Sequence, residues 1–178
     1  AQPSVSTSGT LVYTPADNAF GVATVDVILT DNGDTTYGGV TSSTVQSFTI
    51  TIRPVNDAPM FSTGSNQIVD EDAGAQTIVN WATGINAGAD NESEQTVTWV
   101  VDNNNHGLFS VQPAVSSTGT LTFTPAADAF GVATVDVILT DDGGTAYGGV
   151  TSSTVQSFTI TIRPVNDAPL FSTGSNQI

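Results

Sequence analysis

The chain of 178 residues contains a long internal repeat, and this repeat limits the folds open to it more than any other feature. Residues 2–68 align without a gap to residues 112–178. Eleven of these 67 positions differ, so 56 are identical, and the period is 110 residues. This period has the size of one immunoglobulin-like sandwich domain and is far longer than the period of a solenoid repeat.

The segment Arg-Pro-Val-Asn-Asp-Ala-Pro occurs at residues 53–59 and again at residues 163–169, which sets the expected domain limits. If the last proline of each copy closes a domain, residues 60–169 form one complete repeat. Residues 1–59 are then the C-terminal half of a preceding repeat, and residues 170–178 are the first strand of the next. Residues 1–59 have no counterpart of residues 60–111, a segment of 52 residues. The nine residues 170–178 are too few to replace it. We therefore expect an excerpt from a tandem array.

Alternation of apolar and polar residues within the complete repeat predicts β-strands and no helix of useful length. The period-two pattern is clear at residues 95–101, 119–125, 133–140 and 155–163, and weaker at 66–71, 75–82 and 108–113. Segments rich in Gly, Asn and Asp separate them. Seven short strands in a repeat of this length predict an all-β fold, an antiparallel seven-stranded Greek-key β-sandwich.

The same alternation assigns side chains to the core or to the surface. In the last strand, apolar residues at 158, 160 and 162 should face inward, and residues 159, 161 and 163 outward. Asp26 and Asp136 should face outward from the middle of a strand, and His106 should lie on the surface. The large aromatic side chains expected in the core are Trp81, Trp99, Phe109, Phe123 and Phe130.

The chain is strongly acidic, with 17 Asp and Glu, two Arg and no Lys, which gives a net charge of −15. Nucleic acid and anionic membranes would repel such a chain, whereas cations would be attracted. Cys is absent and there is a single His, so Zn²⁺ is disfavoured. Mg²⁺ requires tighter octahedral geometry than Ca²⁺, which accepts six to eight oxygen ligands. No apolar run is long enough to cross a bilayer.

The acidic residues gather in a few segments that separate the expected strands: residues 70–72, 90–94 and 141–142, with further acids at 17, 31, 34, 57, 128 and 167. Loops of a sandwich lie at its two ends. Acidic loops at both ends, with an Asn-Asp linker between them, predict an oxygen cage for Ca²⁺ at each junction. The alternative for any one of these acids is a solvated surface charge.

Several stretches resemble cadherin repeats. The linker "PVNDAPLF" resembles the inter-domain Asn-Asp signature of cadherins, and "LTDDGGTAYGGVTSSTVQSFTITI" resembles the stretch that precedes it. "ADNESEQTVTWVV" resembles the cadherin acidic loop, and "GLFSVQPAVSSTGTLTFTP" the segment that follows. In order and coverage, the repeat is most similar to the cadherin-like repeats of giant bacterial surface proteins and adhesins.

The resemblance implies which residues would hold Ca²⁺. Asn56 and Asp57 would bridge the first junction, with Asn18 contributed by the preceding repeat and Asp90, Glu92 and Asp141 by the following one. The corresponding upstream residues of the second junction are Glu71, Asp128, Asn166 and Asp167. Pro54 and Pro164 stand where an animal cadherin has its first linker Asp, so we expect fewer ions at each junction.

The function implied is mechanical. We expect a calcium-rigidified extender of a long extracellular bacterial surface protein, whose partners are adjacent repeats of the same chain, and no catalysis. Arg53 and Arg163 end the last strand of each copy and should form salt bridges with carboxylates there. Two alternatives remain open: a filament or sheath subunit whose chains associate laterally, and a module that binds glycans or another cell surface.

Overall fold

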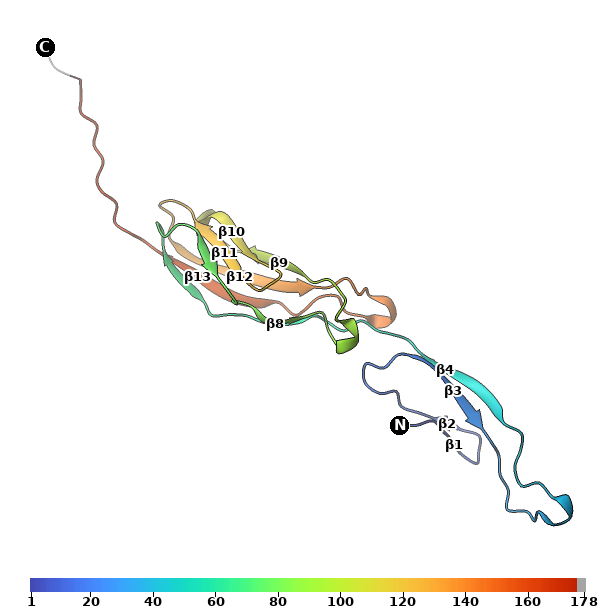
Figure 1. The fold of residues 1–178 in the computed structure, drawn as a ribbon. Helices are drawn as coiled ribbons and strands as arrows, with labels where there is room; N and C mark the ends of the chain where they lie inside the picture. Colours follow the sequence, from blue (N-terminus) through green and yellow to red (C-terminus); the bar gives the residue numbers. More distant parts are fainter. Residues whose placement is uncertain (176–178) are drawn as a thin grey trace. The chain divides into compact units, whose positions relative to one another are not determined.

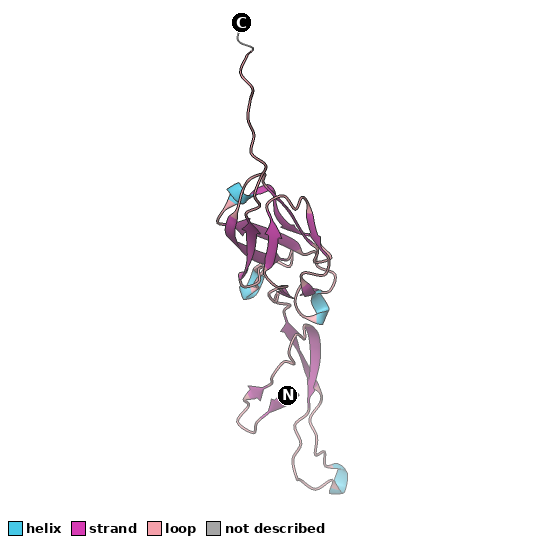
Figure 2. Ribbon diagram, turned by 90° about the vertical axis from the view of Figure 1, so that its left-hand side faces the viewer, coloured by secondary structure: helices cyan, strands magenta, loops and turns pink. Residues whose placement is uncertain are grey.

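The computed structural model describes residues 1–175 and consists almost entirely of strands, turns and loops (Figures 1 and 2). The chain divides into two compact units, Ala1–Val55 and Asn56–Ile178. The division falls before Asn56, four residues earlier than the limit drawn after Pro59, because Asn56 is buried and bonded to residues of the second unit. The all-β class expected from the sequence is confirmed.

The first unit contains two separate two-stranded sheets. Strands β1 (Ser4–Val5) and β2 (Leu11–Val12) form one antiparallel pair. Strands β3 (Gly21–Val27) and β4 (Gln46–Ile52) form the other, and the segment between them carries the short 3₁₀ turn η1 (Thr36–Gly38). Ile50 is the one apolar residue of this unit that is classed as buried among the described residues.

The second unit contains nine strands among its described residues. They are β5 (Met60–Ser62), β6 (Gln67–Asp70), β7 (Gln76–Ile78), β8 (Thr83–Asn86), β9 (Thr98–Asn103), β10 (Phe109–Val115), β11 (Leu121–Pro125), β12 (Gly131–Thr140) and β13 (Gln156–Arg163). One sheet has the order β10-β11-β7, a second has the order β6-β13-β12-β9, and β5 pairs with β8. The 3₁₀ turns are η2 (Asp90–Glu92), η3 (His106–Leu108) and η4 (Ala146–Gly148).

One apolar cluster fills the space between the sheets of the second unit. Strand β12 contributes Ala133, Val135, Val137 and Leu139, all fully buried. Strand β13 contributes the residues at 158, 160 and 162, as the alternation predicts. The β10-β11-β7 sheet and the turn before β8 close the cluster from the other side, with Leu121, Phe123 and Trp81. Alternate residues of each strand point to one face, so the period-two pattern places them together.

The seven expected strand segments each contain a strand, and the structure adds β5 and β8. Segment 75–82 is a strand only over β7, because the chain turns at Asn80, whose φ is 54°. Trp81 therefore lies outside the strand, and its buried side chain enters the core from the region of the turn. The sheets are antiparallel with one exception, since β6 and β13 pair in parallel. The edge strand β6 and the last strand run in the same direction along the unit.

The prediction that Phe130 lies in the core is wrong. Phe130 is 61% exposed, because it lies in the turn before β12 and the neighbouring Ala129 packs against the core in its place. Phe109 and Phe123 are buried as expected, and their rings meet edge to face at 5.9 Å. Trp99 is only partly buried and packs against Phe61 at 4.7 Å.

The tail after the second linker is exposed over its described residues. Residues 170–175 contain no strand, and Leu170 and Phe171 are exposed, although their counterparts Met60 and Phe61 begin β5. Strand β5 forms by pairing with β8, and the tail has no such partner within the described residues. Residues 176–178 lie outside the described part, so the expected first strand of a next repeat stays a prediction.

Replacing Leu139 by Ala should destabilise the second unit by about 2–5 kcal/mol, because it removes a fully buried side chain and leaves a cavity. The matched control is Val132→Ala on the outer face of the same strand, where the side chain is 54% exposed and the cost should stay below about 1 kcal/mol. Urea unfolding followed by Trp fluorescence measures both, since Trp81 and Trp99 lie in this unit. Equal costs would contradict the core assignment.

Candidate functional site

The second unit begins with an asparagine that is buried in polar surroundings. Asn56 is 8% exposed, and its side-chain Nδ2 donates to Asp141 Oδ1 (3.0 Å) and to the carbonyl of Val150 (2.6 Å). Its Oδ1 accepts from Gln95 Nε2 (2.8 Å), and its backbone carbonyl accepts from the Val150 amide (2.9 Å). Because a buried amide must satisfy all its groups, these bonds fix the start of the linker on this unit.

Glu92 holds the next linker residue. Its side chain is buried, at 5% exposure, and Oε1 accepts from the backbone amide of Asp57 (3.0 Å). Its Oε2 accepts from the amide of Ala89 (3.3 Å). Gly88 lies directly beside it, and a Cβ at that position would overlap Glu92 Oε2. A glycine at position 88 is therefore what allows a buried carboxylate to reach the linker.

Asp141 is positioned by the turn that follows β12. Its amide donates to Thr151 O (3.1 Å), and its Oδ1 accepts from the amide of Gly143 (2.9 Å), which is an Asx turn. A Cβ on Gly143 would overlap the side-chain oxygen of Asn56. The loop can thus approach Asn56 closely only with glycine at position 143.

Two acceptor oxygens in this cluster are buried without a hydrogen-bond partner. They are Asp141 Oδ2 and Gln95 Oε1. A buried acceptor without a donor is costly, so each is a place where a cation or a water would lower the free energy. The donor set consists of carboxylate, amide and carbonyl oxygens, which suits Ca²⁺ better than Zn²⁺. Within the described residues, however, no group of three or more His, Cys, Asp or Glu suited to hold a metal occurs.

The structure brings four of the residues predicted for the first junction together: Asn56, Asp57, Glu92 and Asp141. Asp90 is exposed on the same turn, η2, as Glu92. Asn18 belongs to the first unit, and its φ of 56° gives a separate reason for asparagine at that position. Gln95 was not predicted. It carries no charge, and the predicted ligands were chosen mainly from acidic side chains and from the Asn-Asp linker.

Fewer of the residues predicted for the second junction lie close together than at the first junction. Glu71 is buried, at 6% exposure, and its Oε1 accepts from the amide of Val165 (2.6 Å). Asn166 and Asp167 are exposed, and Asn166 Nδ2 donates to the carbonyl of Asp167 (3.0 Å). Asp128 is exposed with a φ of 56°, like its counterpart Asn18. Glu71 therefore holds the start of the second linker much as Glu92 holds the first.

The salt bridge expected at the end of the last strand is present in the second copy. Arg163 Nη2 lies 2.7 Å from Asp70 Oδ1, and its Nε donates to the same oxygen (2.8 Å). The two side chains are 60% and 47% exposed, so solvent screens the pair and it contributes about 0–1 kcal/mol. It joins the ends of β6 and β13, where those strands pair in register.

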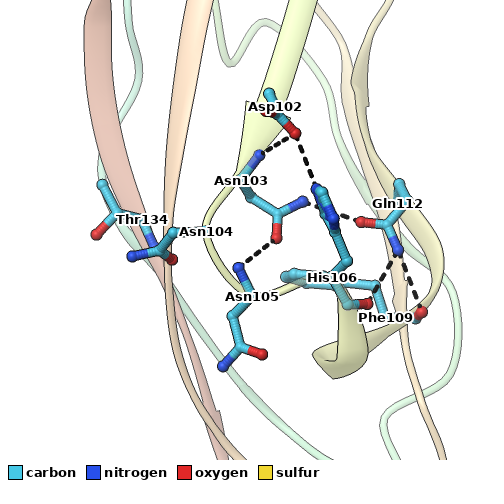
Figure 3. Close-up of polar contacts among 8 residues, drawn as sticks. All are labelled: Asp102, Asn103, Asn104, Asn105, His106, Phe109, Gln112 and Thr134. Carbon is cyan, nitrogen blue, oxygen red and sulfur yellow. Dashed lines mark hydrogen bonds and ion pairs between the residues drawn. The ribbon is translucent and has the colours of Figure 1, made fainter.

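The polar loop that contains His106 is held by its own side chains (Figure 3). His106 Nε2 lies 2.8 Å from Asp102 Oδ1, and the exposed His side chain agrees with the surface position expected. Asn103 is buried and donates to Gln112 Oε1 (2.9 Å), while Asn105 donates its amide to Asn103 Oδ1 (3.0 Å). This run of asparagines therefore has a structural role in shaping the loop.

Residues 31–36 of the first unit correspond to the loop that begins at Asp141. Their carboxylates accept hydrogen bonds from groups within the same loop. Asp31 Oδ1 accepts from the amide of Gly33 (2.8 Å), so the segment is a turn, as expected. The hydroxyl of Thr36 and its amide both donate to Asp34, and these bonds hold the pKa of that carboxyl below its usual value. Asp26 and Asp136 face outward, and each accepts from a serine hydroxyl on the neighbouring strand.

Comparison with known proteins assigns no family. No family model matches the chain, and no match was found among curated proteins. In the part of the chain that the structure describes, no helix has the length and apolar character needed to span a membrane.

Replacing Gly143 by Ala should displace the Asn56 side chain and destabilise the second unit by about 1–3 kcal/mol, because the new methyl group would overlap it. Gly107→Ala is the control in the same unit, since its Cβ would meet nothing closer than 4.0 Å. Unfolding followed by Trp fluorescence measures both free energies. If Gly143→Ala is as harmless as the control, the close contact with Asn56 is not required.

Proposed function

We propose that residues 60–169 form a cadherin-like repeat, a Greek-key sandwich whose two main sheets hold seven of the nine strands, and that Ca²⁺ binds at the end where Asn56 and Asp57 enter. The protein is then an extender of a long extracellular surface protein, in which repeats follow one another along the chain. The resemblance of the linker and its neighbouring loops to cadherin repeats carries the assignment of class.

One observation carries the calcium proposal: Asp141 Oδ2 and Gln95 Oε1 are buried beside the linker without donors. Asn56 Oδ1 lies next to Gln95, and the Glu92 carboxylate lies next to Asp57. These residues offer oxygen atoms from three parts of the sequence, and Asp90 adds an exposed carboxylate on η2. The ligands that would hold Ca²⁺ are therefore Asn56, Asp57, Asp90, Glu92, Gln95 and Asp141.

Charge gives an independent reason for a cation. The chain carries 17 acidic residues against two Arg, and each linker segment stands next to a buried glutamate. Burying a carboxylate costs free energy unless a positive charge or several donors compensate it. Bound Ca²⁺ would supply that charge and hold Asn56 and Asp57 against the second unit. Pro54 and Pro59 fix φ on both sides of the pair and stiffen the same segment.

Rigid linkers suit an extender better than the alternatives. A filament subunit would need a lateral contact surface, and a binding module would need a recognition site. The polar residues around Asn103 and His106, the other large polar cluster, are occupied by bonds within the loop. The proposed position outside the cell, the adjacent repeats as partners and the absence of a catalytic role rest on the resemblance to the cadherin-like repeats of surface proteins.

Adding Ca²⁺ should raise the melting temperature of the second unit relative to EDTA, because an ion that binds only the folded state stabilises it. At a free concentration of 100 Kd the gain is about 2.7 kcal/mol. Asp141→Asn keeps the oxygen that accepts from Gly143 but removes the charge, so Ca²⁺ should bind about tenfold or more weakly. Calorimetric titration and Trp-detected melting measure these effects.

The matched control is Asp31→Asn, which changes the equivalent residue of the first unit and should leave the response of the second unit unchanged. Mg²⁺ at the same concentration distinguishes a specific site from general screening of charge. If the melting temperature of the unaltered chain is the same in Ca²⁺ and in EDTA, the calcium proposal is wrong.

A further inference from the structure

The acidic loop between β3 and β4 contains an asparagine followed by a glycine, Asn32 and Gly33. This is the only Asn-Gly pair in the sequence. Both residues are exposed, and they lie outside any strand or 3₁₀ turn. Because glycine has no side chain, the amide nitrogen of Gly33 can approach the side-chain carbonyl carbon of Asn32 without hindrance from a Cβ. Of all the asparagines in the chain, Asn32 is therefore the one best placed to react with the backbone amide that follows it.

A carboxylate already holds the proton of this amide. The nitrogen of Gly33 donates to Asp31 Oδ1 at 2.8 Å, and that proton must leave before the nitrogen can attack a carbonyl carbon. A general base has to lie within about 2.6–3.2 Å of the atom from which it takes a proton, and Asp31 meets this condition. The base of the loop is closed by the Thr30↔Ser42 bridge. Asp31 is thus positioned to act as the base in a reaction of its own loop.

The second unit contains the same turn, so the arrangement follows from the local sequence. There the nitrogen of Gly143 donates to Asp141 Oδ1 at 2.9 Å, and the residue between them, Asp142, is also exposed. The hydrogen bond and the exposure of the middle residue therefore occur in both copies, whatever else each unit contains. The middle residue of the second copy is an acid, and its Oδ1 accepts from the amide of Thr96 (2.9 Å). The repeat thus accommodates a carboxylate at the position of Asn32.

We propose that Asn32 is a site of spontaneous deamidation, with Asp31 as the base and water as the only co-reactant. The Gly33 nitrogen gives its proton to Asp31 and forms a bond with Cγ of Asn32. The bond between Cγ and the side-chain nitrogen breaks, and that nitrogen takes up the proton and leaves as ammonia. The product is a five-membered succinimide ring. Water then opens the ring at one of its two carbonyl groups, which gives aspartate or isoaspartate at position 32, and no atom is oxidised or reduced.

The reaction changes both the charge and the backbone of the loop. The loop carries Asp31 and Asp34, and deamidation adds a third acid at the position that Asp142 occupies in the second copy. Isoaspartate also inserts the Cβ of residue 32 into the main chain, which lengthens the turn that Asp31 and Gly33 close. The negative charge of the loop therefore increases with the age of the protein. Because the reaction uses no metal, it is independent of the calcium proposal.

The experiment follows the full chain over time at neutral pH, in EDTA so that metal plays no part. Ion-exchange chromatography separates molecules that have gained a negative charge, and peptide mapping by mass spectrometry locates each amide that has become an acid. We expect the acidic form to accumulate with the change at Asn32, as a mixture of aspartate and isoaspartate. Asn91 is the internal reference, because it is exposed on η2 and is followed by Glu92 and not by glycine. It should remain an amide over the same period.

Two variants test the reacting groups. Asn32→Gln keeps an amide but adds a methylene, so the five-membered ring cannot form and the acidic form should be lost. Asp31→Asn keeps an oxygen that can accept from Gly33 but removes the base, so conversion of Asn32 should slow by about tenfold or more. The proposal is overturned if Asn32 and Asn91 lose their amides at the same rate. It is also overturned if Asp31→Asn converts as fast as the unaltered chain, because the carboxylate then takes no part.

Discussion

Burial of one face of the β12–β13 hairpin by residues 60–111 is the interaction on which the second unit depends. The hairpin β3–β4 has the same strand register and the same isolated bridge beyond its end, Thr30↔Ser42 against Thr140↔Ser152. The connecting loop of each hairpin also contains a tyrosine with a left-handed backbone conformation, with φ of 61° at Tyr37 and 59° at Tyr147. Local sequence therefore specifies the backbone of the hairpin in both copies. Only in the second does the face become a core, because only there does a second layer lie over it.

The linker shows the same dependence on context for polar residues. Asn56 is buried and bonded to Gln95, Asp141 and Val150, whereas Asn166 in the identical heptapeptide is exposed and bonds only within the linker among the contacts described. Contacts with the second unit are what hold Asn56 in its buried position. The cost of burying the Asn56 amide is offset by satisfying its donors and acceptors, and two further acceptors nearby are left for a cation or water.

Much of the fold follows from the sequence, because strand alternation and turn residues act locally. The inward positions 158, 160 and 162 and the outward positions of Asp26 and Asp136 need only the two-residue period. The exposure of Phe130 and the formation of β5 and β8 do not follow from this period. They depend on where the chain passes from one sheet to the next. For the candidate site, charge and the linker motif identify Asn56, Asp57, Glu92 and Asp141. Gln95, Gly88 and Gly143 emerge only when loops 31 to 87 residues away in sequence are seen to meet the linker.

The differences between the two copies bear on the role of the acidic loop. Asp34 and Thr36 form a hydrogen-bonded pair in the first copy, and both are lost together in the second, where Gly144 and Ala146 stand. The acid removed from that position is regained two residues earlier, as Asn32 is replaced by Asp142, whose Oδ1 accepts from the amide of Thr96 (2.9 Å). Each loop thus keeps two carboxylates while their partners change. Likewise, Asp17 and Asn18 are replaced by Ala127 and Asp128, again with one acid in each copy. A constant number of carboxylates at shifting positions is what the proposed binding of Ca²⁺ beside these loops would require.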